Sequence, residues 1–424
     1  MQTLSAEEAV ASIQDGQTIF IHGGAATPSA LLAALAARAP QLSGITTVGL
    51  HLDGPCPHLD PALAGHIRHR ALFIGPNARD AVNEGRADYV PIFLSDIPLL
   101  FSRGILPLDA VFINVSPPDA HGYCSLGTSI DATLAAVRNA KRVIAQINPG
   151  MPRTLGDSFV HVDQIDLAVD VDQAPHEHAV EVIGAVERQI GAHVAELVPD
   201  RATLQLGIGA IPAAVGAALH EKRDLGIHTE LFNDTVVDLV ESGAVTGAAK
   251  EVNRGKIVSA FVMGTERLYG FIDDNPMVEM RPVDYTNDTA VIRRFRRMVA
   301  VNSAIEVDLS GQVVADSIGR RLYSGVGGQM DFIRGAALAE EGRAIIALPS
   351  TAAGGSASRI VATIREGGGV VTTRAHVRTV VTEWGVAELF GRSMAERASA
   401  LIAIAHPDFR EELGQAARVL HLDR

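Results

Sequence analysis

The chain has 424 residues, of which 47% are hydrophobic and 20% are charged, and its formal net charge is −13. This composition is typical of a globular protein and excludes an intrinsically disordered chain. The negative charge argues against nucleic acid as a partner, because binding to phosphates requires a basic surface. A chain longer than about 250–300 residues is expected to divide into two domains.

The beginning of the chain and its cysteines indicate a compartment. Residues 1–8 lack the basic start and the apolar run of a signal peptide. The sequence has no uncharged apolar stretch of about 18 residues, so no membrane span is expected. Cys56 and Cys124 are too few for a disulfide framework and are expected to be reduced. These features predict a cytoplasmic protein.

In the first half of the chain, short apolar segments alternate with helical patterns. An Ala- and Leu-rich helix is expected at residues 29–38. Strands are expected at residues 18–21, 45–50, 71–74, 89–93, 110–115 and 142–147. This alternation implies parallel strands joined by helical crossovers, and therefore an α/β sheet with helices on both faces.

The pattern breaks at the polar residues 175–178, continues with a helix expected at 179–197, and then begins again. Further strands are expected at residues 203–206, 256–261, 298–302, 312–315, 344–348, 370–372 and 379–382. The sequence therefore predicts two related open α/β/α domains with mainly parallel sheets, residues 1–185 and residues 186–424. No short-period repeat is present, which excludes a solenoid.

A glycine-rich turn follows the first strand of the second half. Gln205 and Leu206 end that strand, and Gly207, Ile208 and Gly209 lead into a helix. Two glycines allow a ligand to approach the backbone, and the amides at the start of the helix favour an anion. The pattern does not complete the dinucleotide-binding fingerprint G-x-G-x-x-G. A ligand-binding turn and a tight turn without a ligand are both compatible with this sequence.

A second glycine-rich loop contains Gly325, Gly327 and Gly328. Such a loop can direct backbone N–H groups at a developing oxyanion, although a flexible surface loop has the same composition. Between the two loops, Glu230 begins an apolar segment directly after a short polar turn. Together these features predict one carboxylate surrounded by exposed amides, an arrangement that suits acyl transfer through the carboxylate itself.

Several other chemistries lack their usual motifs. The sequence has no H-E-x-x-H motif and no cysteine–histidine spacing typical of zinc, so no metal is predicted. It has neither the G-x-S-x-G motif of serine hydrolases nor a P-loop. His176 and His178 are interpreted as part of a solvated turn, and the basic run 293–297 as a solvated helix face.

Blocks along the whole chain carry a resemblance to a known family. They include residues 20–24, 115–123, 226–234, 263–265, 275–276, 302–303, 325–332, 358–360, 381–383 and 405–410. On these blocks the chain resembles the acetyl-CoA hydrolase/transferase family, the group that includes 4-hydroxybutyrate CoA-transferase and butyryl-CoA:acetate CoA-transferase. Trp384 stands where many relatives carry Tyr, a difference that leaves the preferred acid open.

The resemblance implies two α/β domains with the active site in the cleft between them, commonly in a homodimer. It implies that Glu230 is the nucleophile. The CoA- and oxyanion-binding backbone corresponds to residues 205–209 and to Gly325, Gly327 and Gly328. Asn287 corresponds to the substrate-side amide of the family.

The expected reaction is CoA transfer between a short-chain acyl-CoA and a carboxylic acid. Acetyl-CoA would be one partner, and 4-hydroxybutyrate, butyrate or propionate the acid. The reaction would be ping-pong, through an acyl-glutamyl anhydride and a glutamyl-CoA thioester, with CoA as a substrate and no tightly bound cofactor. A glutamate with an ordinary pKa would already be ionised at neutral pH. Three alternatives stay open: an acyl-CoA hydrolase that uses the same glutamate, a non-catalytic acyl-CoA-binding protein, and an α/β dehydrogenase.

Overall fold

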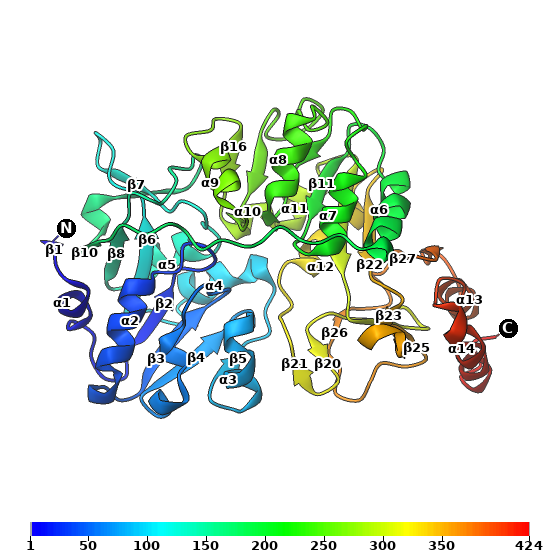
Figure 1. Ribbon diagram of the computed structural model, residues 1–424, viewed down its shortest axis with the longest axis horizontal. Helices are drawn as coiled ribbons and strands as arrows, with labels where there is room; N and C mark the ends of the chain where they lie inside the picture. Colours follow the sequence, from blue (N-terminus) through cyan, green and yellow to red (C-terminus); the bar gives the residue numbers. More distant parts are fainter. Residues whose placement is uncertain (1, 424) are drawn as a thin grey trace. The chain divides into compact units, whose positions relative to one another are not determined.

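The computed structural model describes residues 2–423, which form two compact units (Figure 1). The first unit contains the residues up to Ala179, together with Val258–Thr286 and Leu322–Gly327. The second unit contains Val180–Ile257, Asn287–Arg321 and the residues from Gly328 onward. The predicted division of the chain at residue 185 stays a prediction.

The first unit is built on an eight-stranded sheet in which all the described neighbours are parallel. In sheet order the strands are β1 (Gln2–Thr3), β10 (Leu167–Asp170), β8 (Val143–Ile147), β6 (Ala110–Val115), β2 (Thr18–Ile21), β3 (Ile45–Gly49), β4 (Ile67–Ala71) and β5 (Asp88–Tyr89). The helices are α1 (Ala6–Val10), α2 (Ser29–Arg38), α3 (Arg79–Asn83), α4 (Ile97–Ser102) and α5 (Thr133–Asn139).

Two further segments of the first unit lie outside this sheet. An antiparallel pair joins β7 (Tyr123–Ser125) to β9 (Phe159–His161). The second segment runs from β14 (Ile257–Ser259), most of which belongs to this unit, through β15 (Phe261–Val262), α9 (Glu266–Ile272) and β16 (Val278–Met280) to α10 (Val283–Thr286).

The second unit is built on a six-stranded sheet that is parallel except for its last strand, which pairs antiparallel. In sheet order the strands are β12 (Gly226–Ile227), β11 (Thr203–Leu206), β17 (Met298–Ser303), β22 (Arg343–Ala347), β27 (Thr379–Thr382) and β28 (Gly385–Glu388). The helices are α6 (Ala185–Leu197), α7 (Ala210–Ala217), α8 (Asp234–Glu241), α11 (Thr289–Ile292), α12 (Gln329–Leu338), α13 (Met394–Ala403) and α14 (Pro407–Val419).

The second unit also contains a smaller four-stranded sheet and several short strands. A four-stranded sheet has the order β25 (Ile360–Val361), β18 (Glu306–Asp308), β19 (Val313–Val314) and β26 (Val370–Thr372). The other short strands are β13 (Leu231–Phe232), β20 (Ser317–Ile318), β21 (Arg321–Leu322, which reaches into the first unit), β23 (Thr351–Ala352) and β24 (Ala357–Ser358). The predicted fold class, α/β with mainly parallel sheets, is confirmed in both units.

Strands with continuous apolar runs were the easiest to predict. All six residues of β6 are buried, as expected for an interior strand of a parallel sheet covered on both faces. The strand expected at residues 71–74 is wrong, because the chain is extended earlier, in β4. In β4 the side chains of Arg68 and Arg70 are exposed and alternate with buried ones. Because one face of this strand is polar, its sequence is not a continuous apolar run, and a prediction from apolar runs missed it.

The helix expected from residue 179 begins later, with Gly184 as the N-cap of α6. Residues 179–184 have no regular structure, so the first third of the expected helix is wrong. The strand expected at 89–93 is wrong except at Tyr89, because the strand there, β5, consists of Asp88 and Tyr89. Cys56 and Cys124 are both free, as predicted.

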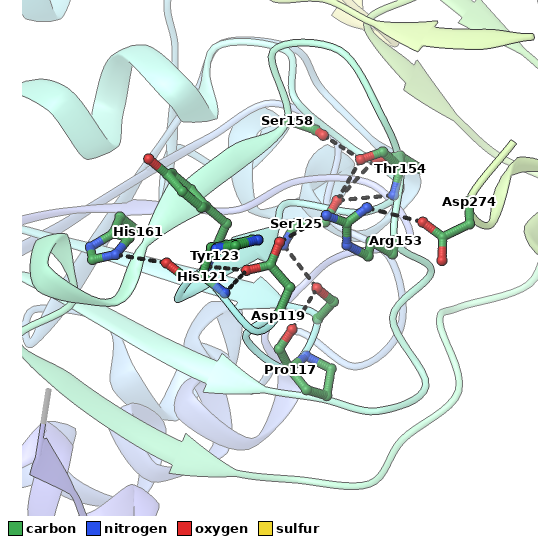
Figure 2. Close-up of polar contacts among 11 residues, drawn as sticks. Pro117, Asp119, His121, Tyr123, Ser125, Arg153, Thr154, Ser158, His161 and Asp274 are labelled. Atoms are coloured by element: carbon green, nitrogen blue, oxygen red, sulfur yellow. Dashed lines mark hydrogen bonds and ion pairs between the residues drawn. The ribbon is translucent and has the colours of Figure 1, made fainter. Parts of the chain in front are cut away.

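A polar network in the first unit fixes the chain that leads from β6 into β7 (Figure 2). The carboxylate of Asp119 accepts hydrogen bonds from the backbone N–H groups of His121 (2.9 Å) and Tyr123 (3.0 Å) and pairs with Arg153 at 3.0 Å. Arg153 also pairs with Asp274 at 3.0 Å. The two backbone N–H donors and the guanidinium lower the pKa of Asp119 to about 2. The family-like block 115–123 therefore has a structural role in this turn.

Candidate active site

Glu230 lies at the carboxyl edge of the sheet of the second unit, three residues after β12 and directly before β13. Strand β12 pairs in parallel with β11, and the N–H of His228 donates to the carbonyl of Leu204 at 3.0 Å. The hydroxyl of Thr229 approaches the carbonyl oxygens of Leu206 (3.1 Å) and Leu231 (2.8 Å). The backbone on both sides of Glu230 is therefore held at the edge of an open α/β sheet where ligands are usually bound.

The side-chain amide of Asn287 contacts two carboxylates. Its Nδ2 lies 2.9 Å from Oε2 of Glu230 and 3.2 Å from Oδ2 of Asp331. Asn287 is fully buried, and Asp331 is 5% exposed. Because an amide nitrogen carries two hydrogens, it can donate one to each carboxylate. This pairing directs the nitrogen side of the Asn287 amide at Glu230.

Gly328 packs directly against Glu230 and Asn287. A Cβ atom at this position would lie 1.8 Å from Oε2 of Glu230 and 2.2 Å from Nδ2 of Asn287. The φ of Gly328 is −97°, which other residues adopt without strain, so close packing is what requires a glycine here. Gly328 is also the N-cap of α12, and no side chain caps that helix end. The start of a helix favours a neighbouring negative charge.

The environment of Glu230 changes the strength of its carboxylate as a base. Burial raises the pKa of Glu230 above its ordinary value, and the hydrogen bond from Asn287 opposes that shift. The expectation of an ordinary glutamate pKa is therefore wrong. A carboxylate with a raised pKa is a stronger nucleophile once ionised, and it is protonated at a higher pH than an ordinary glutamate.

The first glycine-rich turn lies at the end of β11, as predicted. Gln205 is buried, and its Oε1 accepts a hydrogen bond from Nδ2 of Asn302 at 2.9 Å. Gly209 has a φ of 108° and is the N-cap of α7, and Ile208 is 44% exposed. This geometry is compatible both with a turn that binds a ligand and with a tight turn that binds none. The contact of this turn with CoA therefore stays a prediction.

The second glycine-rich loop is ordered up to the point where the chain enters the second unit at Gly328. Gly327 forms an isolated parallel bridge with Phe93, and its carbonyl accepts from the N–H of Leu94 at 3.0 Å. The N–H of Val326, between Gly325 and Gly327, donates to the hydroxyl of Tyr89 at 3.0 Å. The interpretation as a flexible surface loop is therefore wrong. The assignment of Gly325 and Gly327 to the site of Glu230 stays a prediction.

The two histidines of the polar break are partly exposed, and each also has a polar partner in the first unit. Nε2 of His176 lies 2.9 Å from the hydroxyl of Ser29, and Nε2 of His178 lies 2.8 Å from the carboxylate of Asp53.

Nowhere in residues 2–423 do three His, Cys, Asp or Glu side chains converge as a metal site would require. None of the helices in the same part of the chain has the length and apolar character needed to cross a membrane.

Sequence reasoning missed Asp331 as a member of this site. The residue was visible only as one acid in the block 325–332. Its spacing from Gly328 offered a signal, because three residues later in a helix is about one turn, close to the helix start. Asp331 is linked to the site by the hydrogen bond that its carboxylate accepts from the Asn287 amide.

We expect Asp331→Asn to lower kcat about tenfold while the KM for acyl-CoA changes little. The substitution replaces a charged acceptor with a neutral amide oxygen, so the hydrogen bond that helps to orient the Asn287 amide toward Glu230 becomes weaker. Steady-state kinetics would separate the two parameters, with the exposed Glu340→Gln as a matched control. An equal loss in both parameters, or a misfolded variant, would indicate a structural role instead.

Comparison with known proteins agrees with this geometry. The model of the acetyl-CoA hydrolase/transferase N-terminal domain matches residues 2–183, and the model of the C-terminal domain matches residues 264–417. The succinyl-CoA:acetate/propanoyl-CoA:succinate CoA transferase of Fasciola hepatica is 50% identical over 97% of this chain and 86% of its own length. The 4-hydroxybutyrate coenzyme A transferase of Clostridium kluyveri is 47% identical over 97% of this chain and 96% of its own length.

A solved structure of similar sequence has the same fold along nearly the whole chain. RipA from Yersinia pestis superimposes with a TM-score of 0.92 at 36% identity, covering 99% of this chain and 98% of that structure. By contrast, the acetyl-CoA hydrolase of Kluyveromyces lactis is only 25% identical, over 95% of this chain and 86% of its own length. The matches extend over both units. The chain therefore belongs to the acetyl-CoA hydrolase/transferase family.

Proposed function

We propose that this protein transfers CoA between a short-chain acyl-CoA and a carboxylic acid, with Glu230 as the nucleophile. The observation that carries the proposal is the half-buried carboxylate of Glu230, with Asn287 donating to it and Gly328 packed against it. The similar proteins at 42–50% identity support transfer, because each is named a CoA transferase. The named hydrolase is much less similar.

The first half-reaction ends with CoA on the enzyme. The Glu230 carboxylate attacks the carbonyl carbon of the acyl-CoA, the C–S bond breaks, and an acyl-glutamyl anhydride and the CoA thiolate result. The thiolate then attacks the glutamyl carbonyl carbon. The donor acid leaves as its carboxylate, and a glutamyl-CoA thioester remains.

The second half-reaction is the reverse sequence with a different acid. The acceptor carboxylate attacks the glutamyl-CoA carbonyl and releases the CoA thiolate. The thiolate then attacks the acyl carbonyl of the new anhydride, which gives the new acyl-CoA and restores the Glu230 carboxylate. Each addition places negative charge on a carbonyl oxygen. We assign its stabilisation to the Asn287 amide and to backbone N–H groups of the loop with Gly325, Gly327 and Gly328.

Binding of the remaining parts of CoA would position the thioester at Glu230. We assign this role to the backbone of residues 205–209, since the Gly209 turn opens into α7 without a capping side chain. The active site in the cleft between two domains, the homodimer and the cytoplasmic location belong to the same proposal. Sedimentation and cell fractionation measure the last two.

We expect CoA release from acetyl-CoA to depend absolutely on an added carboxylic acid. A panel of propionate, butyrate and 4-hydroxybutyrate, assayed with acetyl-CoA, should give the corresponding acyl-CoA products and ping-pong kinetics, because the first acid leaves before the second binds. Free thiol that appears at the same rate without any acid would contradict transfer and favour the hydrolase.

A further inference from the structure

Trp384 lies at the carboxyl edge of the six-stranded sheet of the second unit. It follows Glu383 directly after β27, and these two residues form the turn into the antiparallel strand β28, because Thr382 pairs with Gly385. It is the only tryptophan in the sequence. The carboxyl edge of parallel strands is where open α/β sheets bind ligands.

The indole ring of Trp384 is oriented by hydrogen bonds. Its Nε1 donates to the hydroxyl of Ser350 at 3.2 Å, and that hydroxyl donates to Oε1 of Glu383 at 2.5 Å. The backbone N–H of Ser350 donates to Oε2 of Glu383 at 2.8 Å, and Ser350 is fully buried. These bonds fix the polar side of a residue that is itself 45% exposed. An aromatic ring that is fixed in advance loses little freedom when a ligand stacks on it.

Two basic side chains lie beside this ring. The guanidinium carbon of Arg410 is 5.7 Å from the ring centroid, and the ring of His406 stands perpendicular to the indole at a centroid distance of 5.4 Å. Nε of Arg410 donates to the carbonyl of Ala405 at 2.9 Å, which holds the guanidinium in place. A positive charge beside an exposed aromatic ring suits a ligand that combines a planar base with phosphates.

The separation of Trp384 from Glu230 is one that CoA can span. Both residues belong to the second unit and lie at the carboxyl edge of one sheet. In the order β12, β11, β17, β22 and β27, four strand spacings of about 4.8 Å give a separation of about 19 Å. About 20 bonds lie between the sulfur and the adenine of CoA, and an extended chain advances by about 1.2 Å per bond.

The loops between these two positions include exposed residues. The glycine-rich turn after β11 exposes Ile208, and Ser303 at the end of β17 is exposed. Residues 353–356, which join β23 to β24 beyond β22, are exposed as well. An extended ligand that reacts at Glu230 would therefore reach Trp384 along an exposed edge of the sheet. A short-chain acid that reacts at Glu230 would not reach it.

We infer that Trp384 is the stacking platform for the adenine base of CoA and that Arg410 pairs with a phosphate of the same nucleotide. This inference rests on the proposed CoA transfer, which places the thioester at Glu230. The difference between tryptophan here and tyrosine in many relatives would then change the affinity for CoA, and the choice of carboxylic acid would not depend on it.

The fluorescence of Trp384 tests the inference directly, because no other tryptophan contributes to the signal. Titration of the wild-type enzyme with CoA or with adenosine 3′,5′-bisphosphate should quench the emission, since a stacked adenine quenches indole. Pantetheine, which lacks the nucleotide, should leave the emission unchanged. This measurement needs no acceptor acid and no turnover. It therefore decides on the inference even if the protein hydrolyses acyl-CoA, whereas an absence of transfer counts against the proposed function alone.

Trp384→Ala should raise the KM for acetyl-CoA about tenfold, because it removes the stacking of one base. The kcat and the KM for butyrate should stay unchanged, and Trp384→Tyr, which keeps an aromatic ring, should recover most of the affinity. Phe390→Ala is the matched control. Phe390 is 68% exposed, but it follows the antiparallel strand β28 and so lies at the opposite edge of the sheet. This variant should have wild-type kinetics.

No quenching at CoA concentrations that saturate turnover would overturn the inference, and so would an unchanged KM for acetyl-CoA in a folded Trp384→Ala enzyme. A rise in the KM for butyrate alone would also contradict it, because the acid would then contact Trp384. If Trp384→Ala does not fold, the quenching measurement on the wild-type enzyme still decides.

Discussion

Glu230→Gln and Glu230→Ala are expected to lower CoA transfer by at least about 10⁴-fold, because both remove the atom that attacks the thioester. The fold should survive, since the Gln side chain has nearly the same shape and Glu230 is only half-buried. Steady-state assays with acetyl-CoA and butyrate measure the loss. The exposed Glu221→Gln is the matched control and should be as active as wild-type enzyme.

Glu230→Asp separates position from charge. It keeps the carboxylate but withdraws it by about 1.5 Å, the length of one C–C bond. A misplacement of 1 Å can cost on the order of 10²-fold, so transfer should fall steeply, and the space that opens can admit water and leave slow hydrolysis. Wild-type transfer rates in Glu230→Gln, with the acid-dependent reaction intact, would exclude Glu230 as the nucleophile.

Gly328→Ala and Gly328→Val are expected to lower kcat by about 10²–10³-fold. Even the methyl group of alanine would occupy the position 1.8 Å from Oε2 of Glu230, so the carboxylate and the Asn287 amide must both move. Because the φ of Gly328 is ordinary, the backbone adds no strain of its own, and any loss of stability comes from the contact of the new side chain with Glu230 and Asn287.

Gly414→Ala in α14 is the matched control for these variants. A Cβ atom there would have open space, with no atom within 4 Å. Alanine in a helix is favoured over glycine by about 1 kcal/mol, so this variant should be fully active and slightly more stable. Thermal unfolding and kcat should be measured on the same preparations. A well-folded Gly328→Val enzyme with wild-type kcat would show that this close contact is unimportant for the reaction.

Much of the fold could be predicted from local pattern. The helix at residues 29–38 and the strands at 18–21, 110–115 and 203–206 have the predicted bounds. In the strands at 18–21 and 110–115, buried apolar residues dominate the segment. Strand β4 was missed because its exposed arginines alternate with buried residues, and α6 begins late because Gly184 caps it. The bounds of these two elements depend on the alternation of buried and exposed residues in β4 and on the N-cap of α6. The apolar content of the two segments does not reveal them.

The site was less accessible to sequence reasoning. The resemblance gave Glu230, Asn287 and Gly328 as separate residues, and the structure brings these three together. Their contacts depend on three separate segments of the second unit, at distances in sequence that no local pattern encodes. The raised pKa of Glu230 and the part played by Asp331 arise from burial and from a shared hydrogen-bond donor, which only the folded chain creates.

Trapping the covalent intermediate tests the central claim most directly. Incubation with acetyl-CoA and no acceptor acid should leave CoA bound to Glu230 as a thioester, and borohydride should reduce that thioester to an alcohol while free carboxylates resist it. Mass spectrometry should then locate the modification on the peptide with His228, Thr229 and Glu230, and it should be absent from Glu230→Ala. Sequential kinetics, with no adduct on that peptide in an enzyme that is turning over, would contradict a covalent role for Glu230.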